Sequence, residues 1–465
     1  MFATPQRIHF IGIGGIGMSG IAEILLTLGY TVTGSDLKRT AVTDRLEILG
    51  ATVHEGHRAE NAAGADVVVT SSAVSAQNPE VLEARARKVP VILRGEMLAE
   101  LMRLKYGIAV AGMHGKTTTT SMIAAVLAAG ELDPTVVVGG RVEALGSNAR
   151  FGRSRYLVAE ADESDRSFLK LMPILAVVTN LDREHMDTYR DMEDVKDAFV
   201  EFMNKVPFYG AIVACADNEM LHGILPRVRR KVVTYGVDAQ ADCRIEMLPK
   251  TGECHSTFLL HVKGAAGAST IGPFELNVPG HHNVLNASAA AAIGLQLQME
   301  PAKIIEGVRS FRGVDRRFQH KGSVRGVAVV DDYGHHPTEV RATLRAACEC
   351  GYGKVHVLFQ PHRYTRTRDM MAEFAEAFGH ADTLQILDIY AASEQPIAGI
   401  TSAALVAAIA KSEHAPTTVE YAANFAEAAA RLAQHAKHGD VVLTLGAGNV
   451  SQAAAVVMDA LKAGA

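Results

Sequence analysis

A glycine-rich turn between an apolar run and an alanine-rich stretch constrains the fold of this chain more than any other feature. Residues 107–120 read G-I-A-V-A-G-M-H-G-K-T-T-T-T. Ile108–Ala111 predicts a strand and Thr118–Ala129 predicts a helix, so the turn between them gathers backbone N–H groups at the positive end of a helix. Lys116 adds a full charge there, and Thr117 offers a hydroxyl group to Mg²⁺. The segment therefore predicts that the chain binds a nucleoside triphosphate.

A second glycine turn lies near the N-terminus. The residues G-I-G-G-I-G at 12–17 separate a predicted strand, Arg7–Ile13, from a predicted helix, Met18–Leu28. In such folds an acidic residue about twenty positions further on meets a ribose hydroxyl group, and Asp36 stands there. The pattern predicts that the pyrophosphate of a nucleotide binds at this turn. By itself it also fits a purely structural turn or a dehydrogenase that binds NAD.

Length, charge and cysteine content limit the class of protein. The 465 residues suit about three domains of roughly 150 residues each. The formal charge of −5, without a basic stripe, argues against nucleic acid as a partner. Five scattered cysteines favour free thiols in a reducing cytosol over a disulfide framework. The apolar stretch Ile8–Tyr30 carries six glycines and Glu23, so we expect neither a signal peptide nor a membrane span. We expect a cytoplasmic protein that is a monomer or a weak homodimer.

Strand and helix signals alternate along the chain and divide it into three α/β units. The first, residues 1–105, carries the glycine turn at 12–17, and the second, residues 106–312, begins at the phosphate loop. The third, residues 313–465, follows a charged joint. We expect a Rossmann-like domain at each end and a central α/β domain like those of P-loop ATPases. Short alternating strands between Ala241 and Val278 predict a small antiparallel insert in the central domain.

Polar clusters follow two predicted strands of the central unit. Tyr156–Ala161 and Ile174–Asn180 end in the clusters at 160–163 and 180–185. Ligands of open α/β sheets collect at the carboxyl ends of the strands, so both clusters should lie beside the phosphate loop. Their carboxylate and imidazole groups, together with a threonine hydroxyl group, suit Mg²⁺ shared with phosphates. Solvated loop acids are the alternative.

The third unit carries two further clusters, D-D-Y-G-H-H-P at 331–337 and Q-P-H-R-Y-T-R at 360–366. Arg363 and Arg366 fit an anion clamp, because a guanidinium group pairs with carboxylate or phosphate in a fixed fork. The adjacent histidines at 335 and 336 raise the alternative of zinc, but no third ligand at helical spacing accompanies them. The clusters favour contact with a substrate or a phosphate group and leave structural histidines open.

Seven motifs in a fixed order resemble the Mur ligase family over essentially the whole chain. They are G-I-G-G-I-G-M-S-G-I-A (12–22), G-M-H-G-K-T-T-T (112–119), E-A-D-E-S-D (160–165), N-L-D-R-E-H-M-D (180–187), P-G-H-H-N-V-L-N-A (279–287), D-D-Y-G-H-H-P-T-E (331–339) and Q-P-H-R-Y-T-R-T (360–367). The third, sixth and seventh look like the alanine-adding members, whereas the ligases that act later differ there. The ligase that recycles the murein tripeptide shares much of the pattern and is an alternative.

The resemblance implies an ATP-dependent ligase of peptidoglycan precursor synthesis in the cytoplasm, with Mg²⁺ as cofactor. The γ-phosphoryl group of ATP would pass to the carboxylate of UDP-N-acetylmuramate, and the amine of L-alanine would attack the acyl phosphate. The UDP-sugar would bind at Gly12, Gly14, Gly15, Ile16, Gly17, Asp36, Ser71 and Ser72. ATP would bind at Gly112, Met113, His114, Gly115, Lys116, Thr117, Thr118, His282, Asn283, Asp315 and Arg317, and the metal at Thr117, Glu160 and His185. L-Alanine or the transferred phosphate would meet Tyr333, His335, His362, Arg363 and Arg366. The catalytic residues would be Lys116, Glu160, His185, His335, Arg363 and Arg366.

Two positions depart from the family pattern. Met113 stands where the family usually has Thr, which removes a hydroxyl group from the phosphate loop. Several Mur ligases hold a second Mg²⁺ with a carbamylated lysine, but the position fourteen residues after His185 is Phe199 here. Lys196 is displaced in helical phase, so we expect no carbamylated lysine. A nucleotide-binding switch without turnover is a further alternative, with Met113 as its only support.

Overall fold

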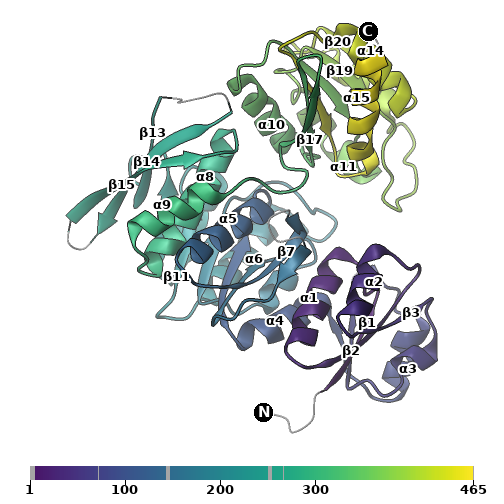
Figure 1. Cartoon of the computed structure of the whole chain (residues 1–465), viewed down its shortest axis with the longest axis vertical. Helices are drawn as coiled ribbons and strands as arrows, with labels where there is room; N and C mark the ends of the chain where they lie inside the picture. The colour runs from purple at the N-terminus through teal and green to yellow at the C-terminus, as the bar shows by residue number, and fades with distance from the viewer. Residues whose placement is uncertain (1–5, 72, 143–146, 250–253, 265–266, 464–465) are drawn as a thin grey trace. The chain divides into compact units, whose positions relative to one another are not determined.

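The chain folds into three β-sheets with helices packed on them (Figure 1). The computed structural model describes residues 6–71, 73–142, 147–249, 254–264 and 267–463. Two compact units are present. The N-terminal compact unit contains Met1–Glu246, Phe258–Phe274 and Leu285–Phe311, and the C-terminal compact unit contains Met247–Thr257, Glu275–Val284 and Arg312–Ala465. In the described ranges, every helix is too short or too polar to cross a bilayer.

The first sheet is parallel and has the order β3-β2-β1-β4-β5. Its strands are β1 (Arg7–Ile11), β2 (Thr31–Asp36), β3 (Thr52–Glu55), β4 (Val67–Thr70) and β5 (Val91–Leu93), and its helices are α1 (Ile16–Thr27), α2 (Ala41–Ile48), η1 (Ala59–Ala62), α3 (Pro79–Ala86) and α4 (Arg94–Arg103). The strand order reverses at β1, so the carboxyl end of β1 is the switch point where such sheets bind ligands. The glycine turn at 12–17 begins there.

The second sheet has ten strands in the order β15-β14-β13-β12-β11-β10-β6-β9-β7-β8. The strands are β6 (Tyr106–Ala111), β7 (Thr135–Val142), β8 (Ser147–Arg150), β9 (Tyr156–Glu160), β10 (Leu175–Val178), β11 (Ala211–Cys215), β12 (Val232–Gly236), β13 (Cys243–Met247), β14 (Ser256–Gly264) and β15 (Gly267–Leu276). The helices are α5 (Lys116–Ala129), η3 (Ser167–Lys170), α6 (Met192–Asn204), α7 (Glu219–Ile224), η4 (Leu225–Arg227), α8 (His281–Gln296) and α9 (Pro301–Ser310). β6 pairs in parallel with β9 on one side and β10 on the other, which sets the phosphate loop between the two polar clusters.

The insert predicted between residues 241 and 278 extends this sheet at one edge. β13 pairs in parallel with β12, and β14 and β15 follow outward in the sheet order. Only two residues separate the end of β14 from the start of β15, so these two neighbouring strands run antiparallel.

The third sheet has the order β16-β17-β21-β18-β19-β20, with only the β16–β17 pair antiparallel among its strands. Its strands are β16 (Gln319–Val324), β17 (Val327–Asp332), β18 (Val355–Phe359), β19 (Thr383–Ile386), β20 (Thr418–Tyr421) and β21 (Val441–Leu445), and its helices are α10 (Pro337–Glu349), α11 (Tyr364–Asp369), α12 (Met371–Ala375), α13 (Ser402–Ile409), α14 (Phe425–His435), η5 (Asn449–Gln452) and α15 (Ala453–Ala463). Alternate residues of β17 enter different cores: Ala328 and Val330 pack with α10 and α13, and Val327 and Val329 with α14 and α15. Helices therefore cover both faces of this sheet.

One expectation about the cysteines is wrong. Cys254 and Cys350, 96 residues apart in the sequence, form a disulfide within the C-terminal compact unit. The expectation of free thiols rested on scattered spacing, and spacing does not reveal which distant residues the fold brings together. Cys215 and Cys243 are buried free thiols, and Cys348 is an exposed one.

Candidate active site

The phosphate loop joins β6 to α5 and is shaped by its glycines. Gly112 has a φ of 132°, and a Cβ atom there would lie 2.0 Å from Thr179 Oγ1. Gly115 has a φ of 82°, and its Cβ would lie 2.8 Å from Asn286 Oδ1. Neither position accepts a side chain unless a neighbour moves. Helix α5 begins directly after this turn, at Lys116.

The residues after β10 brace the loop through His114. Asn180 Oδ1 accepts a hydrogen bond from His114 N (2.9 Å), and Asn180 Nδ2 and Thr179 Oγ1 donate to His114 O (3.0 and 2.7 Å). His114 Nε2 lies 2.9 Å from Asp182 Oδ2. The cluster at 180–185 therefore lies beside the phosphate loop, as parallel pairing of β6 and β10 predicts.

Lys116 lies among carboxylates within this loop. Its Nζ donates to Gly112 O and to Glu163 Oε1, both at 2.7 Å. Burial alone would favour the neutral amine, but the charges of Glu163, Glu184 and Glu160 hold the pKa of Lys116 above its usual value. The site therefore holds a fixed cation where a phosphate group is expected. Glu163 belongs to the predicted acidic cluster at 160–163, but it was not predicted individually as a site residue.

The three predicted metal ligands come from different elements. Thr117 lies in the first turn of α5, Glu160 ends β9, and His185 follows β10. His185 has a φ of 57° and its Nε2 is 3.4 Å from Glu163 Oε1. A left-handed backbone is disfavoured for a residue other than glycine and clusters at functional sites. The side chain of Glu163 is 1% exposed, and its Oε2 accepts no hydrogen bond from the described residues.

The N-terminal glycine turn is closed by the end of β2. Gly12 N and Ile13 N donate to Ser35 O at 2.8 and 3.0 Å, and Gly14 N donates to Asp36 Oδ2 at 2.9 Å. The Asp36 carboxylate thus holds the turn together, and its expected contact with a ribose stays a prediction. Among the other residues predicted for the UDP-sugar, Gly15 precedes α1 and Gly17 lies in the first turn of α1. Ser71 follows β4, and Ser72 lies outside the described residues. Ile16 begins α1, and the structure describes its backbone only.

Arg94, at the start of α4, was not predicted as a site residue. A Cβ atom on Gly17 would lie 2.9 Å from Arg94 Cδ, so the arginine lies against the glycine turn. Arg94 Nη2 also pairs with Asp162 Oδ2 at 2.7 Å. Asp162 belongs to the motif at 160–165, next to the partner of Lys116. One side chain therefore contacts both the N-terminal glycine turn and the 160–165 motif.

The five residues predicted for L-alanine or phosphate lie together in the C-terminal compact unit. The rings of Tyr333 and His335 are 5.2 Å apart, and those of His335 and His362 are 5.9 Å apart. Arg366 Nη1 lies 3.2 Å from His362 Nδ1, and Arg363 is the next residue after His362. Burial and then the charges of His335, Arg366 and Arg363 lower the pKa of His362 to about 3, so its imidazole is neutral near pH 7.

Four residues predicted for ATP also belong to the C-terminal compact unit, namely His282, Asn283, Asp315 and Arg317. Asn283 is buried, and burial followed by the charge of Arg317 lowers the pKa of His282 to about 4. The Arg317 guanidinium lies 5.1 Å from the ring centroid of Tyr333, and Asp315 lies two residues before it. These positions connect the predicted nucleotide residues of this unit with the cluster around Tyr333.

Phe199 occupies the core rather than the site. Its side chain is fully buried, with its ring 5.1 Å from that of Phe168. Lys196 Nζ bonds Glu193 Oε1 at 2.7 Å. Phe199 thus places an apolar ring at the position where several Mur ligases have the carbamylated lysine. The absence of a carbamylated lysine stays a prediction.

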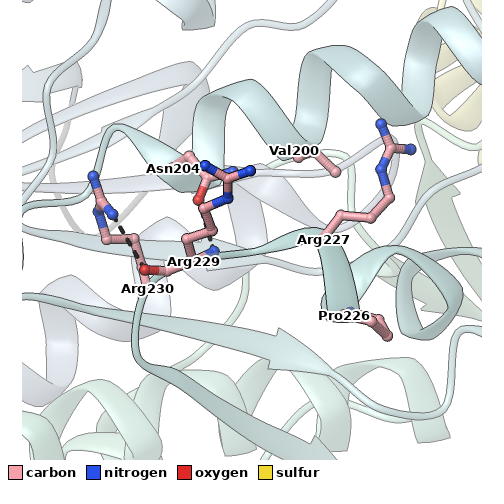
Figure 2. Close-up of a pocket in the computed structure, with 6 residues that line it drawn as sticks. All are labelled: Val200, Asn204, Pro226, Arg227, Arg229 and Arg230. Atoms are coloured by element: carbon pink, nitrogen blue, oxygen red, sulfur yellow. Dashed lines mark hydrogen bonds between the residues drawn. The ribbon is translucent and has the colours of Figure 1, made fainter.

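A cavity of about 650 Å³ lies in the N-terminal compact unit (Figure 2). Arg227, Arg229 and Arg230 line it just before β12 begins, which is the opposite end of the strands from the phosphate loop. Arg227 pairs with Asp197, and Arg230 Nε donates to Val206 O at 2.6 Å. Two of the three arginines therefore already pair with groups in α6 or just after it, and none of the predicted site residues lines the cavity.

Three family models match the chain in sequence. The Mur ligase family catalytic domain matches residues 7–106, the Mur ligase middle domain residues 110–294, and the Mur ligase glutamate ligase domain residues 316–448. The chain belongs to the Mur ligase family. It has the three-domain architecture of a Mur ligase, and ligases of this family depend on ATP.

Relatives from several bacteria carry one function. The UDP-N-acetylmuramate–L-alanine ligase of Acidobacterium capsulatum is 66% identical over 99% of both chains, and that of Koribacter versatilis is 63% identical over 100% of this chain and 99% of its own. The solved structure of the UDP-N-acetylmuramate-alanine ligase MurC from Thermotoga maritima covers 99% of this chain and all of its own with a TM-score of 0.78 and 29% identity. A murein peptide ligase from Psychrobacter arcticus has a TM-score of 0.69, with 98% of each chain covered; at 23% identity it shows a shared fold.

Proposed function

We propose that this chain joins the amine of L-alanine to the carboxylate of UDP-N-acetylmuramate in a reaction driven by ATP, a step of peptidoglycan precursor synthesis. The observation that carries the proposal is the position of Lys116, a half-buried cation held by Glu163 in a strand–turn–helix loop whose glycines admit no Cβ. Relatives named for this reaction are 52–66% identical over nearly their whole length. They favour it over a dehydrogenase, a switch without turnover or a tripeptide ligase.

The chemistry requires activation of a carboxylate. A carboxylate is a poor electrophile because its leaving group would be oxide, and phosphorylation supplies a good leaving group. ATP would donate its γ-phosphoryl group, and the amine would then displace phosphate through a tetrahedral intermediate. The protein has to neutralise charge and align the reactants, which are the tasks of fixed cations and backbone N–H groups. Lys116 and the N-terminus of α5 would serve the phosphates of ATP.

The residues near the loop fit a magnesium ion. The donor set of Thr117, Glu160 and His185 combines hydroxyl, carboxylate and imidazole groups, and the buried Glu163 Oε2 adds an oxygen atom with no hydrogen bond from the described residues. When bound, Mg²⁺ would neutralise charge on the phosphates of ATP. Lys116 would remain a separate fixed charge on the loop.

The remaining assignments follow the clusters. Residues 1–105 would hold the UDP-sugar at the turn 12–17, residues 106–312 would hold ATP, and residues 313–465 would hold L-alanine. Arg363 and Arg366 would bind the carboxylate of the amino acid or the transferred phosphate, because guanidinium groups pair with both. Neutral His362 and the rings of Tyr333 and His335 would line this site. We further propose a cytoplasmic enzyme that is a monomer or a weak homodimer and acts on small molecules alone.

Lys116→Ala tests the proposal. In the wild type, phosphate release should require UDP-N-acetylmuramate, L-alanine and ATP together. The variant should lose turnover by about two orders of magnitude or more, because a fixed charge at the phosphates is missing, while it still binds the UDP-sugar in a calorimetric titration. If the wild type binds ATP and UDP-N-acetylmuramate but shows no turnover, the nucleotide-binding switch is favoured instead. Binding of NAD at the turn 12–17 would favour the dehydrogenase.

A further inference from the structure

Glu394, in the segment after β19, is bound entirely by the residues around the predicted anion clamp. Its Oε1 accepts hydrogen bonds from Arg363 Nε (2.7 Å) and Thr365 Oγ1 (2.6 Å). Its Oε2 accepts one from Thr365 N (3.0 Å). The side chain is 15% exposed. Three donors on one carboxylate leave it suited to hold its neighbours rather than to bind a substrate cation.

The backbone of the same segment is tied to the clamp. Tyr390 N donates to Pro361 O, and Arg363 N donates to Tyr390 O, both at 2.8 Å. The ring of Tyr390 stacks on that of His362, with centroids 5.5 Å apart and planes 9° apart. Residues 390–394 therefore contact residues 361–365 through backbone, ring and carboxylate at once.

Both segments have unusual backbone conformations. Arg363 has a φ of 72°, and Ala392 and Ser393 have φ values of 47° and 71°. Residues with a Cβ rarely adopt this left-handed region, and they keep it only where surrounding contacts impose it. The hydrogen bonds of Glu394 and Tyr390 are contacts of that kind, since they join the two segments on either side of the strained positions.

We propose that Glu394 is a positioning residue for the amino-acid site, acting through Arg363. By engaging Nε it fixes the plane of the guanidinium group, and the clamp is thereby oriented before the carboxylate of L-alanine arrives. An ordered guanidinium loses less freedom on binding, so affinity for the amino acid depends on this carboxylate. The inference rests on the proposed function, because it takes Arg363 as the residue that meets the amino acid.

Steady-state kinetics of the full chain test this role. Glu394→Ala should raise the KM for L-alanine about tenfold or more, with the KM values of ATP and UDP-N-acetylmuramate within about twofold of the wild type. Glu394→Gln, which keeps the shape and one acceptor oxygen, should show a smaller increase of the same kind and decides the matter where the alanine variant fails to fold. Glu349→Gln is the matched control, because Glu349 Oε1 accepts from Arg345 Nε at 3.2 Å on the exposed side of α10. It should leave all three KM values unchanged.

A double-mutant cycle separates positioning from a general structural effect. In an Arg363→Lys background, which lacks the Nε donor, Glu394→Ala should add less than about twofold to the KM for L-alanine. An equal increase with and without Arg363, an unchanged KM for L-alanine, or equal increases for all three substrates would overturn the inference. The wild-type measurement keeps the two claims apart: a wild type without turnover contradicts the proposed function, whereas an active wild type with an insensitive Glu394 contradicts only the positioning role.

Discussion

Arg94 Nη2 and Asp162 Oδ2 are 2.7 Å apart, and this ion pair joins the glycine turn after β1 to the segment after β9. Asp162 also accepts hydrogen bonds from Ser164 N and Oγ at 3.1 and 2.6 Å. Its neighbour Glu163 holds Lys116. The predicted UDP-sugar turn and the predicted phosphate loop are thus connected by side chains from α4 and the 160–165 motif.

Arg94→Ala should raise the KM for UDP-N-acetylmuramate about tenfold, because a charge-assisted hydrogen bond and a guanidinium group beside the turn are lost together. The KM for ATP should change little. Arg103→Ala is the control, since Arg103 on the same helix pairs with Glu100 in an exposed position. An unchanged KM for the UDP-sugar in the Arg94 variant would show that the turn binds its ligand independently of this pair.

Gly112→Ala should weaken ATP binding by at least about tenfold, because its Cβ would lie 2.0 Å from Thr179 Oγ1 at a φ of 132°. Nucleotide titration followed by fluorescence measures the effect. Gly223→Ala in α7 is the control: a Cβ there meets nothing within 4 Å, and alanine favours a helix. Equal ATP affinity in both variants would contradict the role given to the loop.

Glu160→Ala and His185→Ala should each lower activity in a way that added Mg²⁺ partly restores, because each removes one ligand from the ion. The measurement is the Mg²⁺ concentration that gives half-maximal turnover. His261→Ala, in the insert, pairs with Glu246 instead and should leave that concentration unchanged. An unaltered Mg²⁺ dependence in both site variants would refute the metal assignment.

Glu80 should stabilise the first sheet in a pH-dependent way. Burial alone would raise its pKa, but contacts with His9, Ser35 and Asn61 lower the pKa from 4.5 to about 2. A carboxyl group with a depressed pKa contributes stability that is complete above pH 4.5 and is lost as pH falls towards 2. Glu80→Gln should therefore lower the free energy of unfolding by about 1–3 kcal/mol at pH 7 and by less at pH 3.

Denaturant unfolding of both proteins at pH 7 and pH 3 checks the Glu80 prediction. Glu83→Gln on the same helix is the control, because Glu83 forms an exposed pair with Arg87 and should show a small effect at both pH values. A Glu80 effect of the same size at pH 3 and pH 7 would contradict the linkage.

Local sequence patterns predicted the elements that carry the site. The strand predicted at Tyr156–Ala161 matches β9, and the phosphate loop lies between β6 and α5 as expected. Glycine punctuation and apolar runs are local signals, so they identify such elements well. The gathering of Tyr333, His335 and His362 also follows from sequence, because the carboxyl ends of parallel strands meet at one edge of a sheet.

Long-range partners were missed for a physical reason. Arg94 meets a residue 68 positions away, Glu163 one 47 away and Glu394 one 31 away. Nothing near these residues in the sequence indicates which distant side chain they contact, since tertiary packing decides it. The Cys254–Cys350 pair was missed for the same reason.

The proposed ligase activity is tested by phosphate release from ATP with Mg²⁺ and UDP-N-acetylmuramate. One reaction contains L-alanine, and another contains the L-Ala-D-Glu-diaminoacid tripeptide. We expect turnover with L-alanine and with no other amine donor added. Turnover with the tripeptide alone would make the chain a recycling ligase, and no phosphate release in either reaction would contradict the assignment of a ligase.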